Sequence, residues 1–223
     1  MKPIIGIISR VSYPGGTKEL CIEEEYRNAI IKSGGNPILI LPPQEVDYTS
    51  LRYNDQEELT EEEKEMLINQ IKLCNGILKP GGFKINKYDR FITEYLIEND
   101  VPTLGVCLGM QIMANFKRDL WNEKNDSYIN HKSEEKLVHN VTLDKSSKLY
   151  EIIGKETFPV NSRHSFHILP NDYYDISAVS EDNYIEGIER KDKRFFVGVQ
   201  WHPEKMDDET SKKLFDAFIK VCE

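Results

Sequence analysis

The stretch VPTLGVCLGMQIMANF, residues 101–116, changes its pattern at Cys107. An apolar run that reads as a buried strand comes before the cysteine, and apolar residues at helical spacing follow it. The pattern Gly-x-Cys-x-Gly at 105–109 is the cysteine counterpart of a strand-to-helix nucleophile elbow. We expect a tight turn whose flanking positions must lack a Cβ. The thiol should therefore project from the carboxyl edge of a sheet, where open α/β sheets bind ligands.

The position of Cys107 at the start of a helix also favours its thiolate, because the positive end of the helix dipole lies there. A free thiol with a pKa of about 8.5 is mostly protonated at neutral pH. A nucleophilic cysteine therefore benefits from a helix dipole that stabilises its thiolate. The alternative is a small buried hydrophobe, which is how we interpret Cys21, Cys74 and Cys222. Gly-x-Cys-x-Gly alone does not separate the two roles, and further members of a site are needed.

The rest of the N-terminal half alternates between strand-like and helical patterns. Strands are predicted at 3–9, 36–43, 76–79 and 101–106, and helices at 22–33, after Thr60, at 90–98 and at 108–116. Thr60 and Glu63 have the spacing of a capping box, and Gly34-Gly35 has that of a helix end. This alternation is typical of a parallel sheet with right-handed crossovers and helices on both faces.

The C-terminal half has a different pattern. Strand-like runs with short connections lie at 138–142, 174–179, 185–190 and 195–199, and an amphipathic helix is predicted at 208–221. Short connections favour an antiparallel extension of the sheet. Nothing between the halves resembles a linker, so we expect one domain over residues 1–223.

Composition limits the function classes. The 223 residues carry a net charge of −9, which argues against nucleic acid as a partner. No apolar run is long enough to cross a bilayer, and the N-terminal run lacks the features of a signal peptide. Four cysteines without close pairing indicate free thiols in a reducing compartment. We therefore expect a cytoplasmic protein that does not bind membranes.

The predicted strand at 195–199 leads directly into Gln-Trp-His-Pro-Glu at 200–204. His202 can serve as the base that takes the proton of the Cys107 thiol, and Glu204 can orient the imidazole. Residues two apart on an extended backbone point to the same side, so both groups can reach one site. The alternative is that His202 caps a strand and Glu204 is solvated.

Acyl transfer also needs donors that face the developing oxyanion. The N–H of Leu108, directly after the cysteine, is one candidate. Gly81 and Gly82 are the others, because Pro80-Gly81-Gly82 follows a predicted strand at the same edge of the sheet. An ordinary turn is the alternative for this tripeptide.

Taken together, these motifs resemble those of the class I glutamine amidotransferase superfamily. The matching segments, in order, are LKPGG (78–82), GVCLGMQ (105–111) and GVQWHPE (198–204). The resemblance implies a three-layer, flavodoxin-like, mostly parallel α/β fold. It also implies that Cys107, His202 and Glu204 form a triad that hydrolyses a γ-glutamyl amide through a thioester.

Within this superfamily the chain looks most similar to the γ-glutamyl-γ-aminobutyrate hydrolase type. The similarity runs nearly end to end, through KPIIGI (2–7), GGNPILILPP (34–43), VNSRH (160–164) and IEGIE (185–189). Four departures surround the substrate pocket. Leu108 replaces an arginine, His164-Ser165-Phe166 replaces His-His-Gln, Phe83-Lys84 replaces an acidic residue, and the segment that follows is short.

The resemblance assigns substrate binding to Gln111, His164 and Ser165. Gln111 lies one helical turn after Cys107 and should face the same pocket, although it could instead be a solvated helix residue. For His164, a structural role on a loop is equally compatible with the sequence. His131, His139 and His167 show no metal-ligand spacing, so we expect neither a metal nor another cofactor.

We therefore expect a cysteine hydrolase that acts on a small-molecule γ-glutamyl amide, either a γ-glutamyl amine or a glutamine-like compound. A first alternative is a glutaminase subunit that delivers ammonia to a separate synthase. A second is a non-catalytic regulatory or binding protein on the same fold. A homodimer is left open.

Overall fold

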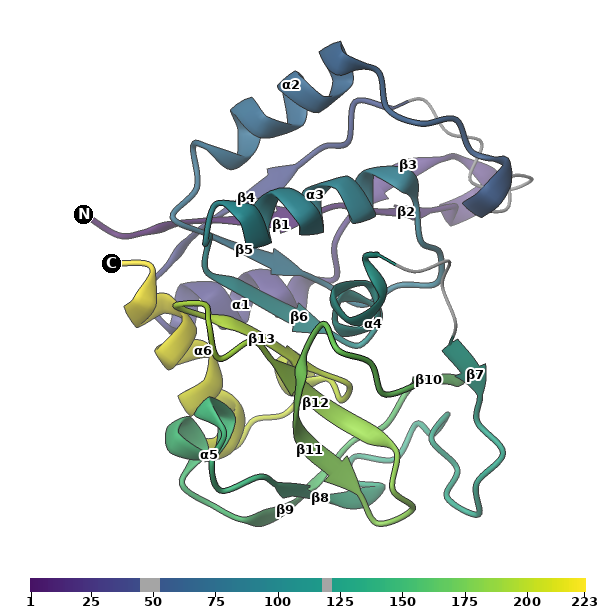
Figure 1. Cartoon of the computed structure of the whole chain (residues 1–223), viewed down its shortest axis with the longest axis vertical. Coiled ribbons are helices and arrows are strands. Elements are labelled where there is room, and N and C mark those ends of the chain that lie inside the picture. Colours follow the sequence, from purple (N-terminus) through teal and green to yellow (C-terminus); the bar gives the residue numbers. More distant parts are fainter. Residues whose placement is uncertain (45–52, 118–121) are drawn as a thin grey trace.

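The computed structural model describes residues 1–44, 53–117 and 122–223, and its centre is a nine-stranded mixed sheet (Figure 1). Across the sheet the strands are β4 (Asn36–Ile40), β1 (Ile4–Ile8), β5 (Gly76–Lys79), β6 (Thr103–Val106), β13 (Phe196–Val199), β12 (Ile185–Glu189), β11 (Asp175–Ser180), β8 (His139–Leu143) and β9 (Thr157–Val160). The strands from β4 to β13 are parallel, and those from β12 to β9 are antiparallel. The predicted mixed α/β sheet with an antiparallel extension is confirmed.

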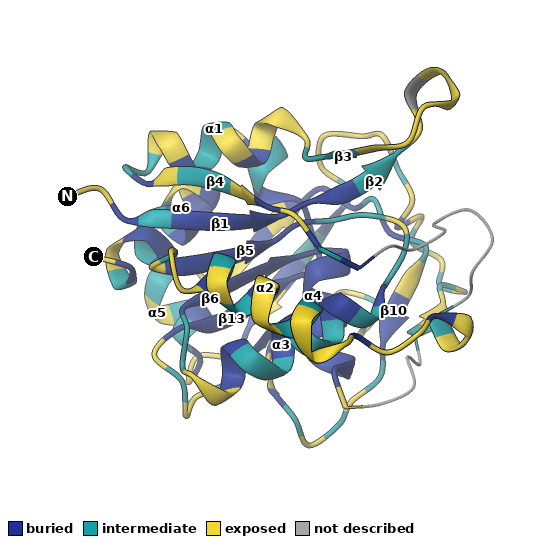
Figure 2. Cartoon of the chain, turned by 90° about the horizontal axis from the view of Figure 1, so that it is seen from above, coloured by how far each residue is buried: buried dark blue, intermediate teal, exposed yellow. Residues whose placement is uncertain are grey.

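Helices cover both faces of this sheet, which gives three layers (Figure 2). On one face lie α1 (Glu24–Lys32), α5 (Lys148–Ile153) and α6 (Glu209–Val221), which share one apolar core. On the other face lie α2 (Glu61–Ile71), α3 (Lys87–Glu98) and α4 (Leu108–Asn115), which pack over two further cores. Successive residues of the central strands point to opposite faces of the sheet. Leu78 packs in the core beneath α1, α5 and α6, and Ile77 packs in the core beneath α2 and α3.

Local sequence signals fix several helix ends as predicted. The N–H of Glu63 donates to Thr60 Oγ1 at 3.2 Å, and the N–H of Thr60 donates to Glu63 Oε2 at 2.8 Å. This reciprocal pair is the predicted capping box at the start of α2. Gly34 ends α1 with a φ of 98°, a conformation that glycine adopts without strain.

Several short elements were not predicted from the sequence. They are β2 (Arg10–Ser12), β3 (Glu19–Cys21), β7 (Asn122–Lys124), β9, β10 (Phe166–Ile168), α5 and the 3₁₀ turns η1 (Pro14–Gly16), η2 (Tyr53–Asp55) and η3 (Pro203–Lys205). Three residues are too few to show a period of two, and Pro159 argues against a strand anywhere but at a sheet edge. β9 does form that edge.

The antiparallel extension curls back over the centre of the sheet. The pairing of β11 with β12 shifts register between Ile176 and Val179, and such irregularities increase strand twist. As a result Phe158 of β9 packs edge-on against Trp201, which follows β13, with ring centroids 5.8 Å apart. Strands that are distant in sheet order thereby meet at one place.

Helix α4 lies unusually close to the sheet. A Cβ on Gly109 would overlap the carbonyl oxygen of Lys79 in β5, and one on Gly105 would overlap the sulfur of Met113. The expectation that both flanking positions must lack a Cβ is therefore confirmed, but for a different reason. Of the three residues, it is Cys107 that has a positive φ, so the glycines are required by close packing of α4 rather than by the turn itself.

Among the described residues, the helices are all too short or too polar to cross a bilayer.

We expect Gly109→Ala to destabilise the protein by about 2 kcal/mol in urea unfolding. Within a helix, alanine is favoured over glycine by about 1 kcal/mol, whereas overpacking against Lys79 would cost about 3 kcal/mol. A net loss of stability would therefore show that the overlap with Lys79 outweighs the gain in helix propensity. Gly154→Ala, at a φ of 71° with open space around it, is the control for strain alone. Unchanged or increased stability of Gly109→Ala would contradict the packing argument.

Candidate active site

The strand-to-helix elbow places Cys107 between β6 and α4 in a strained conformation. Its φ of 49° and ψ of −108° are rare for a residue with a side chain, and such strain gathers at functional sites. The N–H of Cys107 donates to the carbonyl oxygen of Val199 at 2.8 Å, which ties the elbow to β13. The residue is buried, with 7% of its surface exposed.

His202 is held at the neighbouring strand end by Asn161. The N–H of His202 donates to Asn161 Oδ1 at 2.8 Å, and Asn161 Nδ2 donates to the carbonyl oxygen of His202 at 2.8 Å. The two bonds fix the backbone of the proposed base from both sides. Asn161 lies in the VNSRH segment, but its role was missed because the curl of the sheet that brings it to His202 leaves no local sequence signal.

His202 and Glu204 form a short hydrogen-bonded pair. His202 Nδ1 lies 2.6 Å from Glu204 Oε1, and the glutamate side chain is fully buried. The expected extended backbone between them is wrong, since Pro203–Lys205 forms the 3₁₀ turn η3. Pro203 suits the first position of such a turn because its φ is fixed near the helical value. The turn, rather than strand alternation, directs the carboxylate to the imidazole.

The charges of Cys107 and His202 stabilise each other. Burial raises the pKa of the Cys107 thiol, but the His202 charge and a hydrogen bond with it outweigh burial, so the net pKa is lowered. Burial likewise lowers the pKa of His202, whereas Glu204 and then Cys107 raise it, to about 10. The arrangement thus stabilises the thiolate and the imidazolium together.

The Pro80-Gly81-Gly82 loop lies directly against this pair. A Cβ on Gly81 would lie 3.0 Å from His202 Cε1 and 3.6 Å from Cys107 Cβ. One on Gly82 would lie 3.1 Å from a methyl group of Leu108. A side chain at either glycine would therefore press on the other members of the site and move them by a few tenths of an ångström.

The three predicted oxyanion donors are not equivalent. The N–H of Gly81 donates to the Tyr26 hydroxyl at 2.8 Å and is not free to meet an oxyanion in this conformation. We therefore revise the predicted set to Gly82 and Leu108. Leu108 is the first residue of α4, so its N–H belongs to the unpaired first turn of the helix.

Tyr26 is a second site residue that sequence reasoning missed. Helical periodicity placed it on the buried face of α1, but the pattern says nothing about where the hydroxyl points. Burial and the Glu204 carboxylate raise the pKa of Tyr26 well above its ordinary value, which keeps the hydroxyl protonated. The hydroxyl thus links the glycine loop to the acidic member of the predicted triad.

A buried ionic network supports the glycine loop from below. Arg10 Nη1 donates to Asp89 Oδ1 at 2.6 Å, and Arg10 Nη2 donates to the carbonyl oxygen of Pro80 at 3.3 Å. Lys79 Nζ donates to the carbonyl oxygen of Asp89 at 3.1 Å, and burial lowers the pKa of this lysine to about 7. These contacts fix the position of Pro80 relative to β5.

Gln111 is buried, as expected of a residue one turn after Cys107, but its amide bonds to the protein. Its Nε2 donates to the Phe166 carbonyl oxygen and to Gln200 Oε1, each at 3.0 Å, and its Oε1 accepts from Asn122 at 2.9 Å. The structure does not show it open to a substrate. Its role there is to join α4 to β10 and to the segment after β13.

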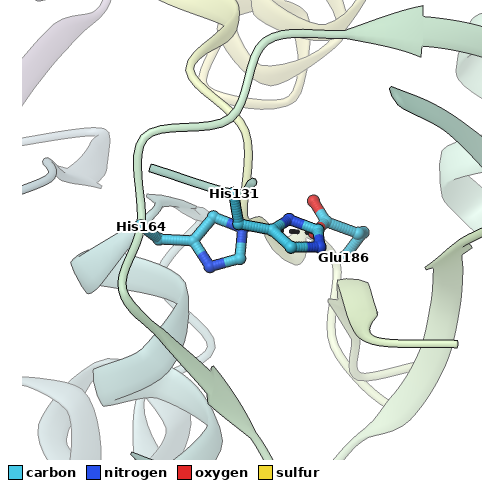
Figure 3. Close-up of side chains that lie close together, drawn as sticks. All are labelled: His131, His164 and Glu186. Carbon is cyan, nitrogen blue, oxygen red and sulfur yellow. Dashed lines mark ion pairs between the residues drawn. The ribbon is translucent and has the colours of Figure 1, made fainter. Parts of the chain in front are cut away.

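His164 lies between the candidate site and a buried carboxylate. Its Nδ1 donates to the carbonyl oxygen of Phe166 at 3.0 Å, and its Nε2 lies 3.3 Å from Glu186 Oε1. Burial lowers the pKa of His164, but Glu186 more than offsets this, and the pKa is raised. Ser165 is half-buried on the bend before β10. One nitrogen or oxygen atom each of His131, His164 and Glu186 lie within 4.8 Å of one another, a grouping that the sequence spacing did not indicate (Figure 3).

Comparison with known proteins identifies the family of the chain. The family model of peptidase C26 matches residues 83–204, more than half of the chain. The chain belongs to the peptidase C26 family. It is therefore a cysteine hydrolase of the class I glutamine amidotransferase type, acting on C–N bonds, as the sequence resemblance predicted.

Individual relatives support the same superfamily. A glutamine amidotransferase-like protein of Rickettsia prowazekii is 27% identical, over 90% of this chain and 88% of that protein. The CTP synthase of Lactobacillus delbrueckii is 31% identical over 73% of this chain. The matched part is only 36% of that synthase, so the chain spans about a third of the length of this relative.

Among solved structures, the glutaminase domain of Trypanosoma brucei CTP synthase shares the fold. It matches 99% of this chain and 93% of its own chain with a TM-score of 0.68 and 18% identity. The predicted flavodoxin-like α/β class is thereby confirmed.

We expect the pH profile of Cys107 alkylation by iodoacetamide to have its midpoint below the value of about 8.5 for a free thiol. The lowered pKa of Cys107 keeps the thiolate populated as the pH falls, and the raised pKa of His202 keeps the imidazolium present up to about pH 10. Glu204→Gln removes the carboxylate that sustains the imidazolium, so it should move the midpoint to higher pH. Peptide mapping would report Cys107 alone.

Glu209→Gln, in an exposed ion pair with Lys213, is the matched control and should leave the midpoint unchanged. Equal midpoints for the wild-type protein and Glu204→Gln would contradict the electrostatic coupling.

Proposed function

We propose that the chain hydrolyses a γ-glutamyl amide through a thioester on Cys107. The observation that supports this is the elbow cysteine beside a buried histidine that is itself paired at 2.6 Å with Glu204. Nucleophile, base and orienting acid are the three roles that acyl transfer from an amide requires.

In this proposal each step has its own group. The Cys107 thiolate attacks the γ-carbonyl carbon, and the N–H groups of Gly82 and Leu108 receive the oxyanion. The His202 imidazolium then gives its proton to the leaving nitrogen as the C–N bond breaks. Water, deprotonated by His202, attacks the thioester and releases glutamate and the thiolate. Glu204 holds the imidazole in the required orientation throughout.

Substrate specificity and setting are part of the same proposal. Ser165 remains a candidate for binding the glutamyl part of the substrate, and Gln111 acts by holding α4 and β10 together. We assign residues 1–223 to one domain, because strands from both halves of the chain form one sheet. The free thiols of all four cysteines fit a reducing, cytosolic compartment.

A second candidate, a glutaminase subunit that feeds ammonia to a separate synthase, is favoured by one observation. The N–H of Gly81 is held by Tyr26, so the oxyanion site of the isolated chain lacks one of its three expected donors. Partner binding that turned this N–H toward the substrate would complete the site. The similarity to part of a CTP synthase agrees with this candidate.

For the first candidate, we expect the purified chain to hydrolyse at least one γ-glutamyl alkylamine with a kcat/KM about 10-fold above that for glutamine. Burial of about two methylene groups of the amine in the transition state would suffice, at about 0.8 kcal/mol each. Glutamate release would be measured for both substrates, with Cys107→Ala as the control that loses activity by at least about 10⁴-fold. Negligible activity on every γ-glutamyl compound would contradict this candidate.

For the second candidate, Tyr26→Phe should raise the kcat for glutamine in the isolated chain, because it removes the acceptor that holds the Gly81 N–H. A gain of about 10-fold corresponds to about 1.4 kcal/mol, within what one oxyanion donor supplies. Tyr95→Phe, a tyrosine of α3 on the opposite face of the sheet, is the control. An unchanged or lower kcat in Tyr26→Phe would count against an oxyanion site blocked by Tyr26.

A further inference from the structure

Three imidazoles surround one buried carboxylate beneath the curled extension of the sheet. Glu186 of β12 is the carboxylate. His131 precedes β8, His139 begins β8, and His164 follows β9 (Figure 3 shows all but His139). All four side chains are at most 2% exposed. The four positions are spread over 56 residues of the chain, so no spacing motif reveals them.

Each imidazole uses one ring nitrogen as a donor to the protein. His131 Nε2 donates to Asp182 Oδ2 at 2.8 Å, His139 Nδ1 donates to the Asn140 carbonyl oxygen at 3.1 Å, and His164 Nδ1 donates to the Phe166 carbonyl oxygen at 3.0 Å. A carboxylate or carbonyl behind the far nitrogen is the usual support of a metal-bound histidine, because it fixes the tautomer and orients the ring.

The other nitrogen of each ring faces the same oxygen. His164 Nε2, His139 Nε2 and His131 Nδ1 lie 3.3, 3.7 and 3.8 Å from Glu186 Oε1. Within the described part of the chain, both oxygens of Glu186 and the Nε2 atoms of His139 and His164 are buried without a hydrogen-bond partner. Lone pairs of neutral imidazoles repel this buried carboxylate, so a cation must balance it, either a metal ion or a proton on His164.

The spacing fits a metal ion better than a direct hydrogen bond. With metal–nitrogen and metal–oxygen distances of about 2.0–2.1 Å, two ligand atoms of a tetrahedral zinc site lie about 3.4 Å apart. The distances around Glu186 Oε1 are close to this value and longer than ordinary hydrogen bonds. Ser162 Oγ lies 3.0 Å from His131 Nδ1, and its hydroxyl would turn away on coordination.

We propose that His131, His164 and Glu186 bind a divalent transition-metal ion such as Zn²⁺, with the ring of His139 packed against that of His131. Imidazole nitrogens and a carboxylate suit zinc and its first-row neighbours rather than Mg²⁺ or Ca²⁺. The ion would tie the segment before β8 and the β9–β10 connection to β12. His164 would then act as a metal ligand instead of binding substrate. The inference stands on this cluster alone and does not depend on the proposed reaction.

The test uses the full chain with Cys107→Ser, because the thiolate and His202 could bind zinc themselves. After treatment with a chelator and addition of Zn²⁺, dialysis and elemental analysis should give one zinc per chain. Competition with a chromophoric chelator should give a Kd of about 1 µM or tighter. Co²⁺ in place of Zn²⁺ should give the visible absorption of a tetrahedral site without sulfur charge-transfer bands.

Added to the Cys107→Ser chain, Glu186→Gln and His164→Gln should each weaken zinc binding by at least about 100-fold. His167→Gln is the matched control, since His167 stacks on Tyr184 outside the cluster, and it should bind zinc normally. Circular dichroism would show that each variant is folded.

Absence of stoichiometric Zn²⁺ and Co²⁺ binding by the folded Cys107→Ser chain would overturn the proposal. In that case a proton on His164 balances Glu186. Sulfur charge-transfer bands with Co²⁺, or full zinc binding by Glu186→Gln, would place the metal elsewhere and overturn it equally.

Discussion

The contact between Gly109 of α4 and the Lys79 carbonyl of β5 is the constraint on which the candidate site depends. A helix that lies this close to the sheet leaves the chain no room for an ordinary turn after β6. Cys107 takes up the resulting strain with its positive φ. The same approach places the first N–H groups of α4 beside the Pro80-Gly81-Gly82 loop. The positions of Cys107, the start of α4 and the glycine loop thus depend on one packing distance.

Near this contact, the buried carboxylate of Asp89 joins several polar groups. Asp89 accepts from Arg10 of β2 and from the N–H of Asn86 at the start of α3. Because Arg10 also donates to Pro80, the small β2–β3 hairpin is connected to the glycine loop. Removing one partner from such a network leaves an uncompensated charge, which is far more costly than losing a surface pair. The hairpin therefore belongs to the support of the site although it lies outside the main sheet.

The sequence was sufficient to predict what depends on local pattern. The parallel strands, most helices, the Thr60 capping box and the elbow around Cys107 all follow from periodicity or from turn chemistry. It was not sufficient to predict contacts between residues that only the tertiary structure brings together. Asn161, Tyr26 and Arg10 reach the site only through the curl of the sheet, the rotation of α1 and a three-residue strand. The bond from the Gly81 N–H to Tyr26 was not predicted, because no sequence pattern shows which partner an N–H finds. The histidine cluster was missed because its members come from four separate segments.

Asn161 directly follows β9, the outermost strand of the sheet, yet it holds the backbone of His202 near the centre. Strand edges open at lower free energy than the interior of a sheet, and they do so without global unfolding. Opening of β9 would remove the two Asn161 hydrogen bonds from the backbone of His202, whereas the N–H of Cys107 would stay bonded to Val199. The placement of His202 relative to Cys107 thus depends on a peripheral strand, whose Phe158 and Val160 also belong to the main apolar core.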